Sequence, residues 1–197
     1  MRQGGGANKG ADFERLICRE LSLWISRGAR ADLFTRNKAS GGAFTTAMRR
    51  RDAEHGQPGD IAPTEIEALE FTRIFAIECK HYRNLELISY MHDVRAKSLL
   101  GQIIALAKRQ AKHAKRHFIV IAKENNRPTW AIGDFSFYMS ARLAYRPSML
   151  PHWHIIHDGL PGRAVYFIEF DEFKRCIQPD RFMAEARELI NKIEEKE

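Results

Sequence analysis

The sequence has few cysteines and no long apolar run. Its three cysteines, Cys18, Cys79 and Cys176, are isolated among 197 residues and form no C-x-x-C or zinc-ribbon spacing. We therefore expect them to be small buried hydrophobic residues. No apolar segment reaches membrane-spanning length, and the N-terminus lacks the apolar stretch of a signal peptide. These absences predict a soluble cytoplasmic protein without a membrane partner.

Positive charge is in excess, with a net charge of +7. A basic chain favours a polyanionic partner such as DNA, although a merely basic soluble protein stays an alternative. The basic residues cluster in a Gly-rich segment and along one later segment. The candidate contacts to nucleic acid are Lys38, Arg49, Arg50, Arg51, Lys108 and Lys112.

The stretch from Phe71 to Tyr82 organises the rest of the chain. Its β-branched and aromatic residues predict a strand, and a carboxylate and an ammonium stand two residues apart near its end. Side chains at i and i+2 of a strand point to the same face. Glu78 and Lys80 are therefore expected to stand together, with Cys79 facing the core.

A carboxylate beside a lysine at the end of a strand has the chemistry needed to act on a phosphodiester. The carboxylate supplies a hard oxygen ligand for Mg²⁺, and the lysine orients or deprotonates a water and offsets phosphate charge. The tripeptide alone is common, because acidic-x-Lys also occurs at Glu172/Lys174 and Glu194/Lys196. Asp158 followed by Glu172-Phe173-Lys174 is the main rival site. His152, His154 and His157 are a weaker alternative as zinc ligands.

A second carboxylate precedes the central strand. Pro58-Gly59-Asp60-Ile61-Ala62-Pro63 is a turn that delivers Asp60 at the start of a short strand. Asp60 and Glu78 are expected to meet across a hairpin pair, joined by a connection over residues 64–70. The polar and basic segment from Ala43 to Gly59 predicts a long functional loop.

Helical and strand patterns alternate along the chain. We predict a helix from Ala11 to Ser26, a strand from Ala31 to Arg36, a loop from Arg83 to Asp93, a helix from Val94 to Arg116 and a strand from His117 to Ala122. A strand, helix, strand succession implies a right-handed crossover in a mixed sheet. Further strands are predicted at 130–132, 154–156 and 164–170, and a last helix at 181–194.

Four short motifs, taken in order, carry a resemblance. They are Lys9-Gly10-Ala11-Asp12-Phe13-Glu14-Arg15, Ala39-Ser40-Gly41-Gly42, Gly59-Asp60-Ile61 and Ile77-Glu78-Cys79-Lys80. Together they resemble the PD-(D/E)xK nuclease superfamily, and they are most similar to its archaeal-type Holliday-junction resolvases. The resemblance covers about residues 9–125.

The resemblance implies a role for each matched position. Asp60, Glu78 and the Cys79 main-chain carbonyl would bind the metal, Mg²⁺ or Mn²⁺, and Lys80 would position the attacking water. Glu14 would join or support the metal site, and Ser40 would lie near the scissile phosphate. Gln102 is a looser match to a supporting polar group.

The implied fold is α/β: a restriction-endonuclease-like core, with a mixed central β-sheet flanked by helices, and a C-terminal α/β extension. We divide the chain into a flexible N-terminus (1–10), the nuclease core (11–124) and the extension (125–197). The expected function is metal-dependent endonucleolytic hydrolysis of branched DNA, such as a four-way junction, by a homodimer. A restriction-like or end-processing nuclease, and a DNA-binding or assembly protein without turnover, are the alternatives.

Overall fold

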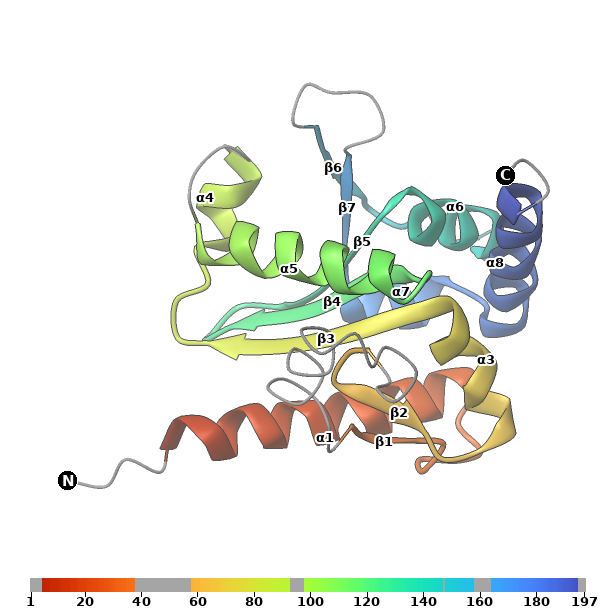
Figure 1. The fold of residues 1–197 in the computed structure, drawn as a ribbon, viewed down its shortest axis with the longest axis horizontal. Helices are drawn as coiled ribbons and strands as arrows, with labels where there is room; N and C mark the ends of the chain where they lie inside the picture. The colour runs from red at the N-terminus through yellow and green to blue at the C-terminus, as the bar shows by residue number, and fades with distance from the viewer. Residues whose placement is uncertain (1–4, 38–57, 93–97, 147, 158–163, 195–197) are drawn as a thin grey trace.

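A computed structural model describes residues 5–37, 58–92, 98–146, 148–157 and 164–194. A five-stranded sheet with the order β3-β4-β5-β7-β6 forms its centre (Figure 1). The pair β3 and β4 is parallel, and the other three pairs are antiparallel. The sheet is therefore mixed, as the sequence predicted, and it is flanked by helices as in a restriction-endonuclease-like core.

The elements follow one another from an N-terminal helix to a C-terminal helix. The strands are β1 (Phe34–Arg36), β2 (Ile61–Pro63), β3 (Phe75–Tyr82), β4 (His117–Glu124), β5 (Thr129–Gly133), β6 (His154–Ile156) and β7 (Val165–Glu169). The helices are α1 (Gly5–Ile25), α3 (Ile66–Ile74), α4 (Leu87–His92), α5 (Leu99–His113), α6 (Phe135–Ala144), α7 (Phe170–Cys176) and α8 (Pro179–Glu194).

The two faces of the sheet are buried by different helices. Alternation along β3 sends Ile77 and Cys79 into a core shared with α1, α3, α6, α7 and α8, and sends Ala76 into a second core under α4 and α5. Figure 1 shows α1 and α5 on opposite sides of β3. Glu78 and Lys80 have the parity of Ala76 and therefore stand on the α5 face.

The predicted strand from Phe71 begins too early. Residues Phe71 to Ile74 are the last turn of α3, and β3 starts only at Phe75. Phe71, Thr72 and Ile74 are buried at helical spacing, so the β-branched and aromatic residues serve a buried helix face. Short apolar runs do not distinguish the two cases, because both a strand and a buried helix contain them.

Asp60 and Glu78 also do not meet across a hairpin. The 64–70 connection includes most of α3, and the bridge between Gly59 and Ile77 is parallel. The partner of β2 in an antiparallel pair is β1. Because a helix connects β2 to β3, the two carboxylates come together through a crossover.

Several helix boundaries differ from the prediction. Helix α1 starts at Gly5, six residues before Ala11, and thus includes residues assigned to a flexible terminus. Helix α5 starts at Leu99, after Ser98 accepts a hydrogen bond from the Gly101 backbone N–H at 3.0 Å. The preceding loop contains the short helix α4. None of the described helices has both the length and the apolar character needed to cross a membrane.

The residues beyond 124 continue the same sheet. Strands β5, β7 and β6 extend it from β4, in agreement with the strands predicted near these positions. Phe182 of α8 is fully buried against aromatic rings from elements on both sides of residue 124, including Phe71 and Phe75 of the central segment and Phe137 of α6. The C-terminal elements therefore complete the core that supports β3.

Candidate active site

Glu78 and Lys80 stand on one face of β3, as their spacing predicted. The Lys80 ammonium donates to Asp60 Oδ2 at 3.0 Å and to Glu78 Oε1 at a shorter distance. The exposed side-chain fractions are 6% for Asp60, 15% for Glu78 and 23% for Lys80. One cation thus bridges two nearly buried carboxylates.

Gly59 brings Asp60 close to β3. Its φ of +90° lies in the region that favours glycine, and an added Cβ would lie 2.4 Å from the Ile77 carbonyl oxygen. The Asp60 backbone N–H donates to that same carbonyl at 2.7 Å. Only a residue without a side chain permits this approach, so Gly59 sets the position of the Asp60 carboxylate.

Further hydrogen bonds fix Asp60 in place. Its Oδ2 accepts from the Cys79 backbone N–H at 2.8 Å. On the other side, the Asn37 backbone N–H donates to the Asp60 carbonyl at 2.8 Å, and the Asn37 amide donates to the Gly59 carbonyl at 3.0 Å. A buried carboxylate needs such partners, because an unpaired one would carry a large desolvation cost.

Glu14 reaches the site from helix α1. Its Oε2 accepts a hydrogen bond from Arg36 Nε at 2.5 Å, and its side chain is 14% exposed. The negative charge of Glu14 contributes to raising the pKa of Glu78 and that of Cys18. The structure therefore places Glu14 within electrostatic reach of the pair, where the Arg36 guanidinium partly offsets its charge.

The site is short of positive charge. Burial raises the pKa of Glu78, and the Asp60 charge raises it further, against the opposing effect of Lys80. The pKa of Lys80 is also raised: burial lowers it, but the charges of Glu78 and Asp60 outweigh that effect. Because its pKa is raised, Lys80 is a cation at neutral pH. A single ammonium cannot neutralise two buried carboxylates, so the negative charge of the pair is not fully balanced.

The donor set suits a hard divalent cation. The residues that would hold one are Asp60, Glu78 and the Cys79 carbonyl, and oxygen atoms of this kind are the ligands that Mg²⁺ and Mn²⁺ prefer. The Cys79 N–H points to Asp60, and the carbonyl of the same residue points to the same edge of the strand. Among the described residues, no three His, Cys, Asp or Glu side chains are grouped as a metal site.

Among the described residues, the acidic and basic groups of the rival site do not come together. Glu172 and Lys174 lie on helix α7, where residues two apart do not face each other. Lys174 pairs with Glu20 and Asp171, whereas Glu172 accepts from His152. Asp158 lies outside the described residues.

The histidine alternative also lacks support among the described residues. His152 binds Glu172, and His154 packs against the Trp130 ring, with 5.3 Å between ring centroids. The grouping needed for a zinc site is absent from the described part of the chain.

The remaining predicted positions are scattered or undescribed. Gln102 is exposed in the first turn of α5, and the described interactions include none between it and the carboxylates. Lys112 is exposed on α5, and the Lys108 ammonium lies 5.6 Å from the centre of the Phe118 ring. The positions outside the described residues are Lys38, Ser40, Arg49, Arg50 and Arg51.

Sequence reasoning missed three residues of the site. Gly59 adopts the left-handed backbone position, Asn37 binds the loop that carries Asp60, and Arg36 partly offsets the charge of Glu14. Gly59 had a sequence signal, because a glycine directly precedes the aspartate. Arg36 and Asn37 had none, since their partners lie 22 residues away.

A mixed sheet with a carboxylate, carboxylate and lysine site at one edge is the arrangement of a PD-(D/E)xK nuclease. The chain matches the model of a family described as "Phage putative PDDEXK endonuclease" over residues 5–184, and it belongs to that family. The match runs well past residue 125, so the family includes the C-terminal strands. Neither a search of curated proteins nor a search of solved structures finds a match.

Proposed function

We propose that this protein is a metal-dependent endodeoxyribonuclease that hydrolyses phosphodiester bonds in branched DNA, with a four-way junction as its preferred substrate. The observation that carries the proposal is the Lys80 ammonium held between Asp60 and Glu78. A module that only bound DNA would gain nothing from carboxylates placed beside phosphates that repel them.

The chain's own residues supply the groups for hydrolysis. Asp60, Glu78 and the Cys79 carbonyl would hold Mg²⁺ or Mn²⁺, with Glu14 beside them. A bound divalent ion supplies charge stabilisation at the phosphate and lowers the pKa of a water. Lys80 would orient the attacking water and offset charge on the phosphate.

The proposed preference for branched DNA rests on the four sequence motifs, which in their order are most similar to those of archaeal-type Holliday-junction resolvases. The described helices include none marked by its residues as a recognition helix, which favours recognition of shape and backbone charge. Symmetric cleavage of a four-way junction requires two active sites, and the described residues of the chain contain one. We therefore propose that the protein acts as a homodimer, and gel filtration with and without junction DNA tests this.

The deciding experiment compares cleavage of a four-way junction, a linear duplex and a single strand in Mg²⁺ or Mn²⁺. The variants are Glu78→Gln and Lys80→Gln, and the matched control is Glu172→Gln, which changes the acidic-x-Lys pair on α7. We expect junction cleavage that both site variants lose and the control retains. Equal cleavage of linear duplex would indicate a restriction-like or end-processing nuclease, and binding without any cleavage would indicate a non-catalytic module.

A further inference from the structure

Two arginines lie near each other where β3 and β4 begin. Phe75 and His117 are register partners at the start of these parallel strands. Arg73 lies two residues before Phe75, and Arg116 directly precedes His117. Because neighbouring strands are about 4.8 Å apart, the topology brings the two residues together at one end of the sheet.

The backbone at Arg116 is fixed by the end of helix α5. Lys115 adopts a φ of +53°, and its N–H donates to the Lys112 carbonyl at 3.1 Å. The Arg116 N–H donates to the Ala111 carbonyl at 2.8 Å. This pair of bonds is a Schellman motif, in which glycine usually occupies the left-handed position. A lysine there keeps a further exposed cation beside Arg116.

The Arg116 side chain lacks a hydrogen-bond partner on one nitrogen. Its Nη1 is buried without a partner among the described residues. Burial lowers the pKa of Arg116, and the Arg73 charge lowers it further, so the two guanidiniums repel each other. The carboxylates described nearby are engaged elsewhere: Asp134 with His117, and Glu70 with Arg187.

The geometry points to a phosphate-binding site formed by Arg73 and Arg116, with Lys112 and Lys115 at its rim, that holds the DNA backbone away from the active site. A guanidinium with one unpartnered nitrogen, near a second guanidinium, suits a bridging phosphate, because the fork of N–H donors matches phosphate oxygens. This inference rests on the proposed function, since it assigns the ligand as DNA.

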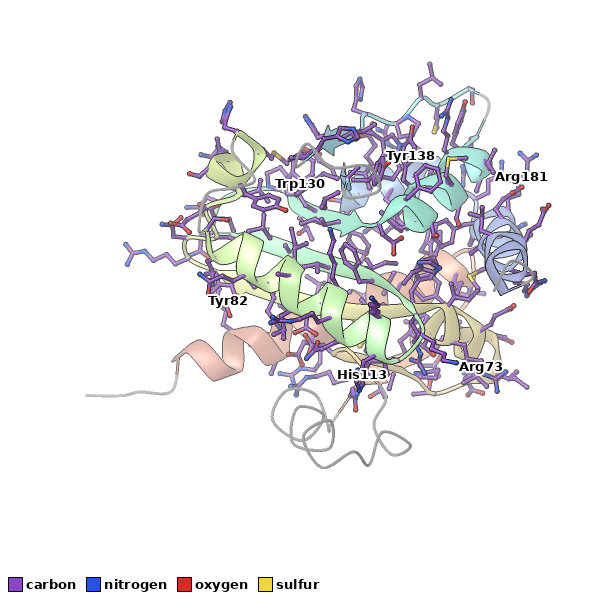
Figure 2. The ribbon with its side chains drawn as sticks, turned by 45° about the horizontal axis from the view of Figure 1, so that its top comes forward. Arg73, Tyr82, His113, Trp130, Tyr138 and Arg181 are labelled. Carbon is purple, nitrogen blue, oxygen red and sulfur yellow. The ribbon has the colours of Figure 1, made fainter. Side chains whose placement is uncertain are left out.

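The position of Arg73 and Arg116 at the start of β3 and β4 sets their distance from the candidate active site. The five steps from Phe75 to Lys80 along β3 correspond to about 17 Å, at roughly 3.3 Å per residue. Phosphates on one strand of a duplex advance about 3.4 Å along the helix axis per nucleotide, so a duplex lying along β3 would place this site about five nucleotides from the scissile phosphate. Figure 2 shows Arg73 and Tyr82 at opposite ends of β3, with His113 of α5 toward the Arg73 end.

The test measures DNA affinity by fluorescence anisotropy without divalent metal, over a range of salt concentrations. The variants are Arg73→Gln, Arg116→Lys and the double change Arg73→Gln/Arg116→Gln. The control is Arg181→Gln, an exposed arginine on α8 labelled in Figure 2. Arg116→Lys keeps the positive charge but removes the forked N–H donors of the guanidinium. Arg73→Gln changes an exposed side chain, so the fold should be unaffected.

We expect the double variant to bind about eightfold more weakly near 0.1 M salt, with a salt slope reduced by about 0.9, the value for one lost phosphate contact. Arg73→Gln should lose about half of that slope, and Arg181→Gln should match the native chain. An unchanged slope in the double variant, while the native chain still binds and cleaves DNA, would overturn the site and leave the nuclease intact. If the native chain binds no DNA, the proposed function fails along with it.

Discussion

The Lys80 ammonium lies 3.0 Å from Asp60 Oδ2 and also binds Glu78, so it holds together two carboxylates that repel each other. This relationship links the chemistry of the site to the stability of the fold. Removing one carboxylate should relieve the repulsion between Asp60 and Glu78. Removing the Lys80 ammonium should leave that repulsion without a compensating charge. Activity and stability are therefore expected to change in opposite directions at Glu78.

Glu78→Gln should abolish cleavage without weakening the fold. Glutamine keeps the shape of the side chain and removes a buried charge whose pKa is raised by burial and by Asp60. We expect activity to fall at least about a hundredfold, with an unchanged or higher midpoint of thermal unfolding. A marked loss of stability in Glu78→Gln would contradict this account.

Lys80→Gln should lower both the activity and the midpoint of thermal unfolding, because it leaves two buried carboxylates without a cation.

The pH dependence of stability should reflect Glu78. Its raised pKa means that the folded state holds the proton more tightly than the unfolded state, whose value is about 4.5. The favourable contribution is therefore fully present below pH 4.5 and is lost as the pH rises through the folded pKa. In EDTA, urea unfolding of the native chain and of Glu78→Gln should show a stability difference that grows in favour of the variant as pH increases. A difference that does not vary with pH would refute the assignment.

Gly59→Ala should misplace Asp60. The new Cβ would lie 2.4 Å from the Ile77 carbonyl oxygen at a φ of +90°, so the loop must move away from β3. We expect a loss of at least about 2 kcal/mol in the free energy of unfolding, together with loss of cleavage. The control is Gly10→Ala in helix α1, where nothing lies within 4 Å of the added Cβ. That change should stabilise the protein by about 0.5–1 kcal/mol and leave cleavage intact.

Phe182→Ala should show that the C-terminal helix belongs to the core. Phe182 is fully buried against Phe75, Phe137 and other rings. Truncating it should lower the free energy of unfolding by about 3–5 kcal/mol in a urea titration. Phe135→Ala is the control, because that ring is 56% exposed, and its effect should stay under about 1 kcal/mol. A small effect at Phe182 would contradict its burial in the core that α8 shares with β3.

Local patterns predicted the fold class and the closeness of Glu78 and Lys80. The period-2 spacing of Glu78 and Lys80 places them on one face whatever strand lies beside them. The boundary near Phe71 could not be predicted in the same way. Phe71 and Ile74 fill a buried helix face, and only the packing of α3 against α8 and the sheet distinguishes that environment from a strand.

The sequence by itself predicted which side chains would carry the proposed chemistry, because the residue types and their spacing along β3 are local properties. It also determined the alternation that sends Cys79 inward. The tertiary structure decided how Asp60 arrives, through a helical crossover and a parallel bridge at Gly59. It also decided that Arg36 offsets Glu14 and that Arg73 lies near Arg116. Such pairings depend on which strands become neighbours, and strand order is set by packing of the whole chain, which no local pattern contains.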